Sequence, residues 1–470
     1  MLVKTVLLLP LPEIGHCAPA IRIARRLRAR GNTVKWLALP AICGHLENAG
    51  EEVLPLVSLL RGNLTGHLQE RRALIEAAAD GRFAQFVRAL SPDVVVVDVI
   101  LSLLLLPLQE IGIPGLTLSV TLPDDIDAKA LSPWLDYTPS SGLWGSIKRR
   151  VLFAGLHLVA WILRLYDFEN LVDMGRRSLI GQQLPKTILR RPGFTVLYHL
   201  PVPELIACSE TFDFPREQVL HRHFVGPCVE AMKNLVPFPF DELDGRPLVV
   251  CAFGSMAHRY RGHRNALCRI LEIARERPQW QWVVSTGQAF STSTDIPANV
   301  IAREWLPQWE LLQRAALFIT HGGMASVKES ILAGVPMLII PGACDQPGNA
   351  ARVMHWGMGL KIDAKATKGR LAGAIDRLLT EPGFRAATRK MQAHFIKDNE
   401  SSRAEQLIEQ TAECPLTQIP FTPRWNQWPM DTRMPSKDGA IPPACMDLHV
   451  EGKESDNNTF VLNSRNEPKE

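Results

Sequence analysis

The fold is decided by one stretch, Leu317-Phe-Ile-Thr-His-Gly-Gly-Met-Ala-Ser-Val-Lys-Glu-Ser-Ile-Leu-Ala-Gly-Val-Pro-Met-Leu-Ile-Ile340. It begins with an apolar run of strand length and ends with another, Met337–Ile340. Between them apolar residues recur at helical spacing, and Gly334-Val-Pro336 ends the helix. A strand, a turn, a helix and a second strand form the repeating unit of a parallel α/β sheet.

The turn in this unit, His321-Gly-Gly323, is rich in glycine. Glycine leaves the backbone N–H groups at the start of the helix unobstructed, and the positive end of the helix dipole lies at the same place. Both features favour a bound phosphate, so the sequence predicts an anion site at this turn.

Side chains suited to the other parts of a nucleotide sugar flank the turn. Trp305 offers a flat ring on which a base can stack, and Gln308 carries a donor and an acceptor for a base edge. Glu329 can accept hydrogen bonds from two ribose hydroxyls, and Asp345-Gln346 can do the same for a sugar. Base, ribose, diphosphate and sugar thus find matching groups close together in the chain.

This ordered block resembles the donor signature of the UDP-dependent glycosyltransferases, the superfamily of plant, macrolide, sterol and carotenoid glycosyltransferases. The resemblance implies the GT-B fold, in which two doubly wound Rossmann-like α/β domains face each other across a cleft. The block consists of Trp305-Leu-Pro-Gln308, His321 to Ser326, Glu329, Gly334-Val-Pro336, Pro341, Asp345-Gln346 and Asn349.

The same resemblance implies which residues hold the donor. The expected contacts are uracil with Trp305 and Gln308, ribose with Glu329, the diphosphate with Ser255, His321, Gly323 and Ser326, and the sugar with Asp345 and Gln346. Plant members carry Trp-Asn where this chain has Met324-Ala325, so one phosphate contact is missing and the choice between UDP and dTDP stays open. A glutamine at the position of Gln346 is similar to the pattern of glucose-using members, which favours glucose as the sugar.

Each of these residues also has a structural interpretation when taken alone. A tryptophan near a proline is usually half-buried packing, and a Gly-Gly turn is usually just a turn. His321 alone is typical of a hydrogen-bonded residue at a helix start, and Glu329 of a solvated helix face. Their succession favours function, because core packing does not require these polar types at the carboxyl ends of two strands, where open α/β sheets bind ligands.

The amino-acid composition limits the class of protein to which the chain can belong. The chain of 470 residues is long enough for two domains, and 46% hydrophobic with 21% charged residues is typical of a globular protein. A net charge of +4 is too small to indicate a nucleic-acid partner. The nine cysteines form no C-x-x-C pair, which favours reduced cytoplasmic thiols over disulfides or a zinc site. No metal is expected, and Asp125-Ile-Asp127 is discounted because it lies outside the donor domain.

Three apolar stretches of the chain could be mistaken for a signal peptide or for membrane segments. Met1–Pro12 contains two prolines and is followed by Glu13, so it is expected to form a buried first strand rather than a signal peptide. Val94–Leu108 and Val151–Tyr166 are both shorter than the roughly 20 residues of a spanning helix. The second is predicted to be helix core, with peripheral contact at a membrane surface as the alternative. A cytoplasmic protein is expected.

The pattern along the chain predicts two domains. An acceptor domain is expected over 1–226, with a helical and aromatic insertion over about 121–199, and a linker over 227–246. A nucleotide-sugar domain follows over 247–412, and a proline-rich tail over 413–470 is predicted to be disordered. Within these, Pro10–Cys17 is expected as a loop before a helix over Ala18–Arg30, and Phe384–Ala412 as a final helix that crosses back onto the first domain.

Catalysis is assigned to His16 and Asp98. Transfer of a sugar to a hydroxyl needs a base, and His16 lies in a loop after the first strand, similar to the Gly-His-x-x-Pro loop of family members. Asp98 is a carboxylate inside an apolar run and so needs a partner. By resemblance it pairs with His16 and orients the imidazole. The alternative for Asp98 is an N-cap of the following helix.

These observations together predict an inverting, metal-independent hexosyltransferase. It would move a hexose, glucose favoured, from a UDP-sugar co-substrate to a lipophilic hydroxylated small molecule such as a terpenoid, polyketide, sterol or carotenoid. No other cofactor is expected, and the oligomeric state stays open. Two alternatives remain: a catalytically silent partner of another glycosyltransferase, and a UDP-sugar epimerase, which would not need the apolar insertion.

Overall fold

A computed structural model describes most of the chain. The described residues are 3–61, 67–123, 133–138, 145, 147–148, 151–152, 154–155, 200, 202–216, 221–230, 237–254, 261–287 and 296–413. Ser255, most of the predicted insertion, Asp125-Ile-Asp127 and the tail after Glu413 therefore lie outside the described residues. The domain boundaries at 226 and 246 stay a prediction.

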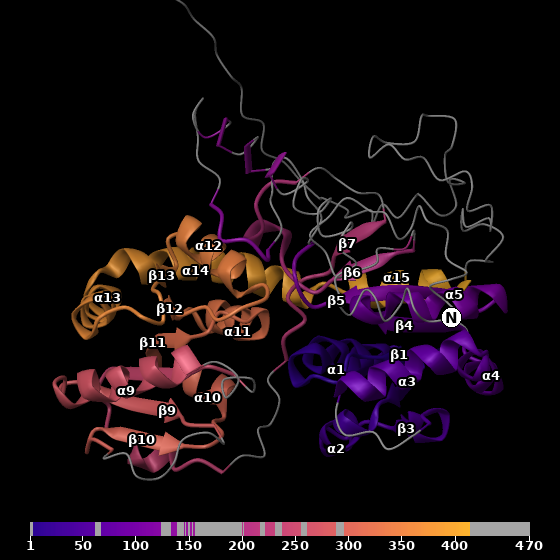
Figure 1. Cartoon of the computed structure of the whole chain (residues 1–470), viewed down its shortest axis with the longest axis horizontal. Helices are drawn as coiled ribbons and strands as arrows, with labels where there is room; N and C mark the ends of the chain where they lie inside the picture. Colours follow the sequence, from indigo (N-terminus) through magenta and orange to yellow (C-terminus); the bar gives the residue numbers. More distant parts are fainter. Residues whose placement is uncertain are drawn as a thin grey trace, which may run out of the picture.

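The first sheet has seven parallel strands in the order β3-β2-β1-β4-β5-β6-β7 (Figure 1). Its central strands are continuous apolar runs, which is why they are buried on both faces. The bounds are β1 Thr5–Leu9, β2 Thr33–Ala38, β3 Val53–Pro55, β4 Val94–Asp98, β5 Gly115–Ser119, β6 Glu204–Ile206 and β7 Arg222–Phe224.

The second sheet has six parallel strands in the order β10-β9-β8-β11-β12-β13. The strands predicted from the opening stretch are confirmed as β11 and β12. The bounds are β8 Leu248–Ala252, β9 Gln281–Ser285, β10 Val300–Arg303, β11 Ala315–Thr320, β12 Met337–Ile339 and β13 Gly359–Lys361.

The strand order reverses direction between β1 and β4 in the first sheet and between β8 and β11 in the second. Ligands of open α/β sheets bind at such switch points, outside the carboxyl ends of the strands. The sequence places His16 and Asp98 after β1 and at the end of β4, and His321 directly after β11. The topology thus brings each group of predicted residues to a switch point.

Helices cover both faces of each sheet (Figure 1). In the first half of the chain they are α1 Ile14–Ala29, α2 Pro40–Asn48, η1 Leu56–Leu59, α3 His67–Ala79, α4 Arg82–Ala89, η2 Val99–Leu104, α5 Leu105–Glu110 and η3 Glu210–Phe212. In the second half they are η4 Phe240–Glu242, α9 Arg261–Arg275, α10 Gln308–Leu312, α11 Met324–Ala333, α12 Gln346–His355, α13 Lys368–Thr380, α14 Pro382–Glu400 and α15 Arg403–Glu413.

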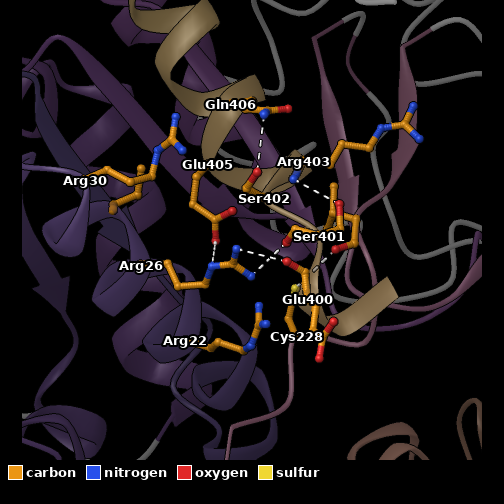
Figure 2. A network of polar contacts seen from close by, with 12 residues as sticks. Arg22, Arg26, Arg30, Cys228, Glu400, Ser401, Ser402, Arg403, Glu405 and Gln406 are labelled. Carbon is orange, nitrogen blue, oxygen red and sulfur yellow. Dashed lines mark hydrogen bonds and ion pairs between the residues drawn. The ribbon is translucent and has the colours of Figure 1, made fainter. Parts of the chain in front are cut away.

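The single final helix predicted over Phe384–Ala412 is wrong, because the chain breaks into α14 and α15 at Ser401-Ser402. Three main-chain carbonyls at the break accept hydrogen bonds from arginines of α1. Ser401 Oγ accepts from Arg403 N over 3.2 Å at the start of α15 (Figure 2). Arg26 donates to Ser401 O over 2.8 Å and to Glu400 O over 3.2 Å, and Arg22 donates to Asn399 O. After the break, α15 packs against α1, β4 and β5 of the first sheet.

Two buried cations join the sheets. Lys328 of α11 donates from Nζ to Ala207 O over 2.8 Å and to Pro227 O over 2.9 Å, so an ammonium of the second sheet's helix binds the end of β6 and the start of the linker. Arg352 of α12 donates from Nε to Asp213 Oδ1 over 2.7 Å. Neither role was predicted from the sequence.

Among the described residues, no helix combines the length and the apolar character that crossing a membrane requires. The stretch Val151–Tyr166, for which peripheral contact was considered, lies almost wholly outside the described residues.

Replacement of Gly226 by alanine tests the close approach between the end of the first domain and α14. Gly226 has φ +85°, and an added Cβ would lie 2.2 Å from the carbonyl oxygen of Asp398. Gly245 has nearly the same φ, +84°, with no atom within 4 Å of an added Cβ, so Gly245→Ala is the matched control. We expect Gly226→Ala to lower the free energy of unfolding by about 3 kcal/mol or more and Gly245→Ala by about 1 kcal/mol.

Urea denaturation followed by fluorescence measures both changes. Equal losses in the two variants would contradict a contact at Gly226 and would leave only the backbone conformation as the cause.

Candidate active site

His16 lies in the first turn of α1, not in a loop. The predicted loop Pro10–Cys17 is wrong beyond Glu13, because α1 begins at Ile14 and continues through Pro19. Proline is typical of the first helical position, so Pro19 favoured a later start. His16 N donates to Glu13 O over 2.9 Å, which closes the first turn of the helix.

His16 and Asp98 are in direct contact. His16 Nδ1 lies 2.7 Å from Asp98 Oδ2, and the Asp98 side chain is 2% exposed while that of His16 is 14% exposed. The other carboxylate oxygen, Oδ1, accepts from Ile100 N over 2.9 Å and caps the 3-10 helix η2. Asp98 therefore fulfils both interpretations made from the sequence, one with each oxygen.

The surroundings of His16 favour its charged form. Burial of the ring lowers the pKa of His16. The charge of Asp98, the hydrogen bond to Asp98, and the charges of Glu13 and Asp345 all raise this pKa, and together they outweigh the effect of burial. The net result is a His16 pKa above its ordinary value of 6.5. Because Asp345 belongs to the second sheet's α12 cap, the imidazole experiences charges from both sides of the cleft.

Two of the predicted base and ribose ligands, Gln308 at the start of α10 and Glu329 in the second turn of α11, are in direct contact. Trp305 is 46% exposed, so its ring is available for stacking. Gln308 donates from Nε2 to Glu329 Oε2 over 2.7 Å and to Ser326 Oγ over 3.3 Å. Burial raises the pKa of Glu329 to about 6, although the Gln308 hydrogen bond lowers it. These contacts orient the Glu329 carboxylate. Glu329 is therefore not a residue on a solvated helix face, which was its alternative interpretation.

His321 lies between two glycines at the second switch point. An added Cβ on Gly254 would lie 2.7 Å from His321 Cε1, and one on Gly323 would lie 2.5 Å from His321 Nε2. Burial, with a smaller contribution from His263, lowers the pKa of His321 to about 4, so the imidazole is neutral at physiological pH. Gly323 is the N-cap of α11 and leaves the helix start without a side-chain cap. Backbone N–H groups there can donate to an anion.

Asp345 and Gln346 are positioned by the loop before α12. Asn349 donates from Nδ2 to Asp345 Oδ2 and to Gly322 O, both over 3.0 Å, and so connects this loop to the His321 turn. Gln346 Oε1 accepts from Gly342 N over 2.7 Å and from Ala343 N over 3.2 Å. The amide oxygen is therefore occupied, and the amide nitrogen is the group that Gln346 can offer to a sugar.

A segment from the first half of the chain reaches this loop. Pro133 O accepts from Gly348 N over 3.0 Å, and Asp136 forms an ion pair with Lys361. This contact could not be predicted from the sequence, because the short segment 133–138 has neither helical nor strand periodicity. It places main chain of the first half next to the predicted sugar ligands.

Of the predicted donor ligands, the structure joins Gln308 of α10 to Ser326 and Glu329 of α11, and it brings His321, Gly323, Asp345 and Gln346 around the N-terminus of α11. Trp305 lies between β10 and α10. Ser255 lies outside the described residues. Within the described part of the chain, no group of three or more histidine, cysteine or acidic side chains is arranged to hold a metal ion.

The fold and these residues define a class of protein. A solved structure of the glycotransferase of kitacinnamycin superposes with a TM-score of 0.65 at 24% identity, covering 87% of this chain and 99% of the other. This likeness shows the GT-B fold. A model of the family described as UDP-glucoronosyl and UDP-glucosyl transferase matches residues 165–398. The chain belongs to the UDP-dependent glycosyltransferase superfamily.

Relatives in this superfamily differ in how much of their length is matched. The NDP-glycosyltransferase YjiC of Bacillus subtilis is 30% identical over 217 residues, which are 45% of this chain and 54% of YjiC. The chain thus spans about half the length of that relative. The 4'-demethylrebeccamycin synthase of Lentzea aerocolonigenes is 26% identical over 432 residues, which are 86% of this chain and 98% of the synthase.

The variant Asp98→Asn isolates the charge of Asp98, because an amide oxygen can still cap η2. We expect the pKa of His16 to fall from above 6.5 to below it, since burial is then opposed only by the smaller effects of Glu13 and Asp345. NMR titration of histidine Cε1-labelled protein measures this pKa directly. A His16 pKa that stays above 6.5 in the variant would contradict the assigned cause.

The same shift has a consequence for stability. A pKa raised in the folded state stabilises the fold fully below the unfolded value and loses this effect as pH rises through the folded pKa. The loss of unfolding free energy in Asp98→Asn should therefore be greater at about pH 5.5 than at about pH 9.

Proposed function

We propose that this protein transfers a hexose, glucose favoured, from a UDP-sugar to a hydroxyl of a lipophilic small molecule in secondary metabolism. The observation that carries this proposal is the contact between His16 and Asp98 at one switch point, with the ordered donor residues at the other. The relatives support the class of reaction, since the names of two of them include a glycosyltransferase and a synthase of a rebeccamycin derivative.

His16 is the proposed base. With Nδ1 held by Asp98, Nε2, which lies 3.9 Å from Glu13 Oε2, is the nitrogen that can accept the proton of an acceptor hydroxyl. The hydroxyl oxygen forms a bond to the anomeric carbon while the bond from that carbon to the diphosphate oxygen breaks. The electron pair leaves with the diphosphate, and the proton stays on the imidazole, whose charge Asp98 stabilises. Attack opposite the leaving group inverts the configuration.

The leaving diphosphate is proposed to bind at the start of α11. Backbone N–H groups after Gly323 and the helix dipole stabilise its charge. Neutral His321 can donate one hydrogen bond there without adding a charge. Nucleotide discrimination between UDP and dTDP would come from the surroundings of Trp305 and Gln308, since Met324-Ala325 offers no polar side chain to the phosphates.

UDP release from UDP-glucose tests the proposal, with and without a panel of lipophilic alcohols. We expect release to depend on the alcohol and to fall roughly a hundredfold or more in His16→Ala, because the general base is lost. His394→Ala is the control, since His394 is exposed on α14. Release without any alcohol and with an epimerised sugar would support an epimerase. UDP binding without turnover in wild type would support the silent-partner alternative.

Trp305→Ala tests the base-stacking role. Stacking of a base on an aromatic ring contributes about 1–3 kcal/mol of binding free energy. We therefore expect the KM for UDP-glucose to rise about ten- to hundredfold in this variant. Trp305→Phe keeps a ring face and should lose much less. The same assay with dTDP-glucose compares the two nucleotides. If Trp305→Ala leaves KM unchanged, the base binds elsewhere.

A further inference from the structure

A segment of the first half of the chain, residues 133–138, contacts elements of the second sheet at two points. Pro133 O accepts from Gly348 N of α12 over 3.0 Å. Asp136 forms an ion pair with Lys361 of β13, which lies 225 residues away in sequence. The proposed mechanism gives this segment no role.

The first contact supplies a hydrogen bond that α12 cannot make by itself. The first N–H groups of a helix have no partner within the helix. At the start of α12, Gln346 N donates to Ala343 O, and Pro347 has no N–H. The N-cap residue makes no side-chain hydrogen bond to the helix start. Pro133 O is therefore the acceptor that satisfies the N–H of Gly348.

This contact requires a glycine at position 348. An added Cβ on Gly348 would lie 2.0 Å from Pro133 O and 2.5 Å from Pro133 C, and both are main-chain atoms. Within a helix glycine is less favourable than alanine, so helix propensity gives no reason for this residue. The carbonyl of Gly348 is also held, because it accepts from Arg352 Nη1 over 3.0 Å and Arg352 binds Asp213 of the first half.

The same turn of α12 carries the predicted sugar ligands. Asp345 and Gln346 lie three and two positions before Gly348. Asn349 follows Gly348 directly and donates from Nδ2 to Asp345 Oδ2 over 3.0 Å. A shift of this turn therefore moves both predicted sugar ligands.

The predicted base and ribose ligands belong to other elements. Trp305 lies between β10 and α10, and Gln308 of α10 donates to Glu329 of α11 over 2.7 Å. The hydrogen bond and the ion pair of segment 133–138 go to α12 and β13 instead. Loss of these two contacts should therefore weaken the binding of the sugar more than that of the nucleotide.

We propose that segment 133–138 positions Asp345 and Gln346 for the sugar, and that the hydrogen bond from Gly348 N to Pro133 O is the main contact by which it does so. This inference rests on the proposed function, because it concerns the sugar part of the same donor site. The acceptor half of the chain thereby takes part in holding the sugar of the donor. The predicted base and ribose ligands all belong to the second half.

Calorimetric binding of UDP-glucose and of UDP to Gly348→Ala tests this proposal. The added methyl group displaces Pro133, which leaves a helix-start N–H without its acceptor and moves the sugar ligands. We expect the Kd for UDP-glucose to rise at least about tenfold. The Kd for UDP should change by less than about threefold, since the nucleotide ligands stay in place, and this also verifies that the variant is folded.

Gly373→Ala is the matched control. Gly373 also lies within a helix, α13, and no neighbouring atom lies within 4 Å of its added Cβ. This variant should bind both ligands as wild type does.

A charge exchange between Asp136 and Lys361 tests the second contact, and both side chains are partly exposed. In Asp136→Lys and in Lys361→Glu two like charges meet, so we expect the Kd for UDP-glucose to rise about two- to fivefold while that for UDP is unchanged. The double variant restores an opposite pair and should return the Kd for UDP-glucose toward its wild-type value. Two residues that act separately would give no such rescue.

Several results would overturn the positioning role. Equal losses of affinity for UDP-glucose and UDP in Gly348→Ala would show that the contact supports the whole site, and unchanged binding of UDP-glucose would show that it supports neither part. If Gly348→Ala does not fold, the charge exchange decides. Single variants that bind UDP-glucose as wild type does, or a double variant without rescue, then overturn the proposal.

Failure of the proposed function gives a different pattern. UDP-glucose binding that weakens selectively in Gly348→Ala, without transfer to any alcohol by wild type, supports the positioning role while the proposed reaction fails. Transfer by wild type with a KM for UDP-glucose that Gly348→Ala leaves unchanged supports the reaction and overturns the positioning role. Absence of UDP-glucose binding to wild type overturns both.

Discussion

The hydrogen bonds of Lys328 to two main-chain carbonyls tie the second sheet to the first. Burial lowers the pKa of Lys328, and such a group is tolerated inside a protein only when its donors are satisfied. The carbonyls of Ala207 and Pro227 do this, and they belong to the chain that leaves the first sheet. Since Lys328 lies on α11, the helix whose start faces the proposed diphosphate, this contact also sets where the diphosphate lies relative to the first sheet.

Further contacts fix the same geometry from the other side. Asn399 exchanges two hydrogen bonds with the main chain of Val229, and Arg352 binds Asp213 while its guanidinium lies 4.5 Å from the ring centre of Phe214. All use buried or half-buried polar groups that would be costly to separate. The two switch points are therefore held facing each other, and a charge at Asp345 can act on His16.

Much of this arrangement could be predicted from the sequence. The strands are continuous apolar runs, and the polar residues at their carboxyl ends have no structural reason to occur in that order, so β11, α11, β12 and the position of Asp98 followed directly. Element boundaries were less predictable. Pro19 is compatible with a helix interior here, and the carbonyls beside the break at Ser401-Ser402 bind arginines of α1, which are far away in sequence.

The residues that sequence analysis missed share one property. Lys328 and Arg352 are charged residues on helices, where a charge is normally expected to face water. Their burial depends on which segment of chain packs over them, and periodicity within one helix does not contain that information. A cation has to be placed in three dimensions before its partners can be recognised.

The crossover of α15 also concerns the order in which the chain can fold. Leu407 and Ile408 are 4% and 0% exposed in the core of the first sheet, together with Val6, Ile21 and Leu205. During synthesis the strands of the first sheet leave the ribosome long before this helix does, so one face of that sheet stays without its cover while the second sheet is being made. Domains generally fold in order of synthesis, and exposed apolar surface favours aggregation in the interval. Here the amino-terminal half cannot complete its hydrophobic core until α15 has been synthesised. Packing of α15 against the first sheet is then the step that completes this core.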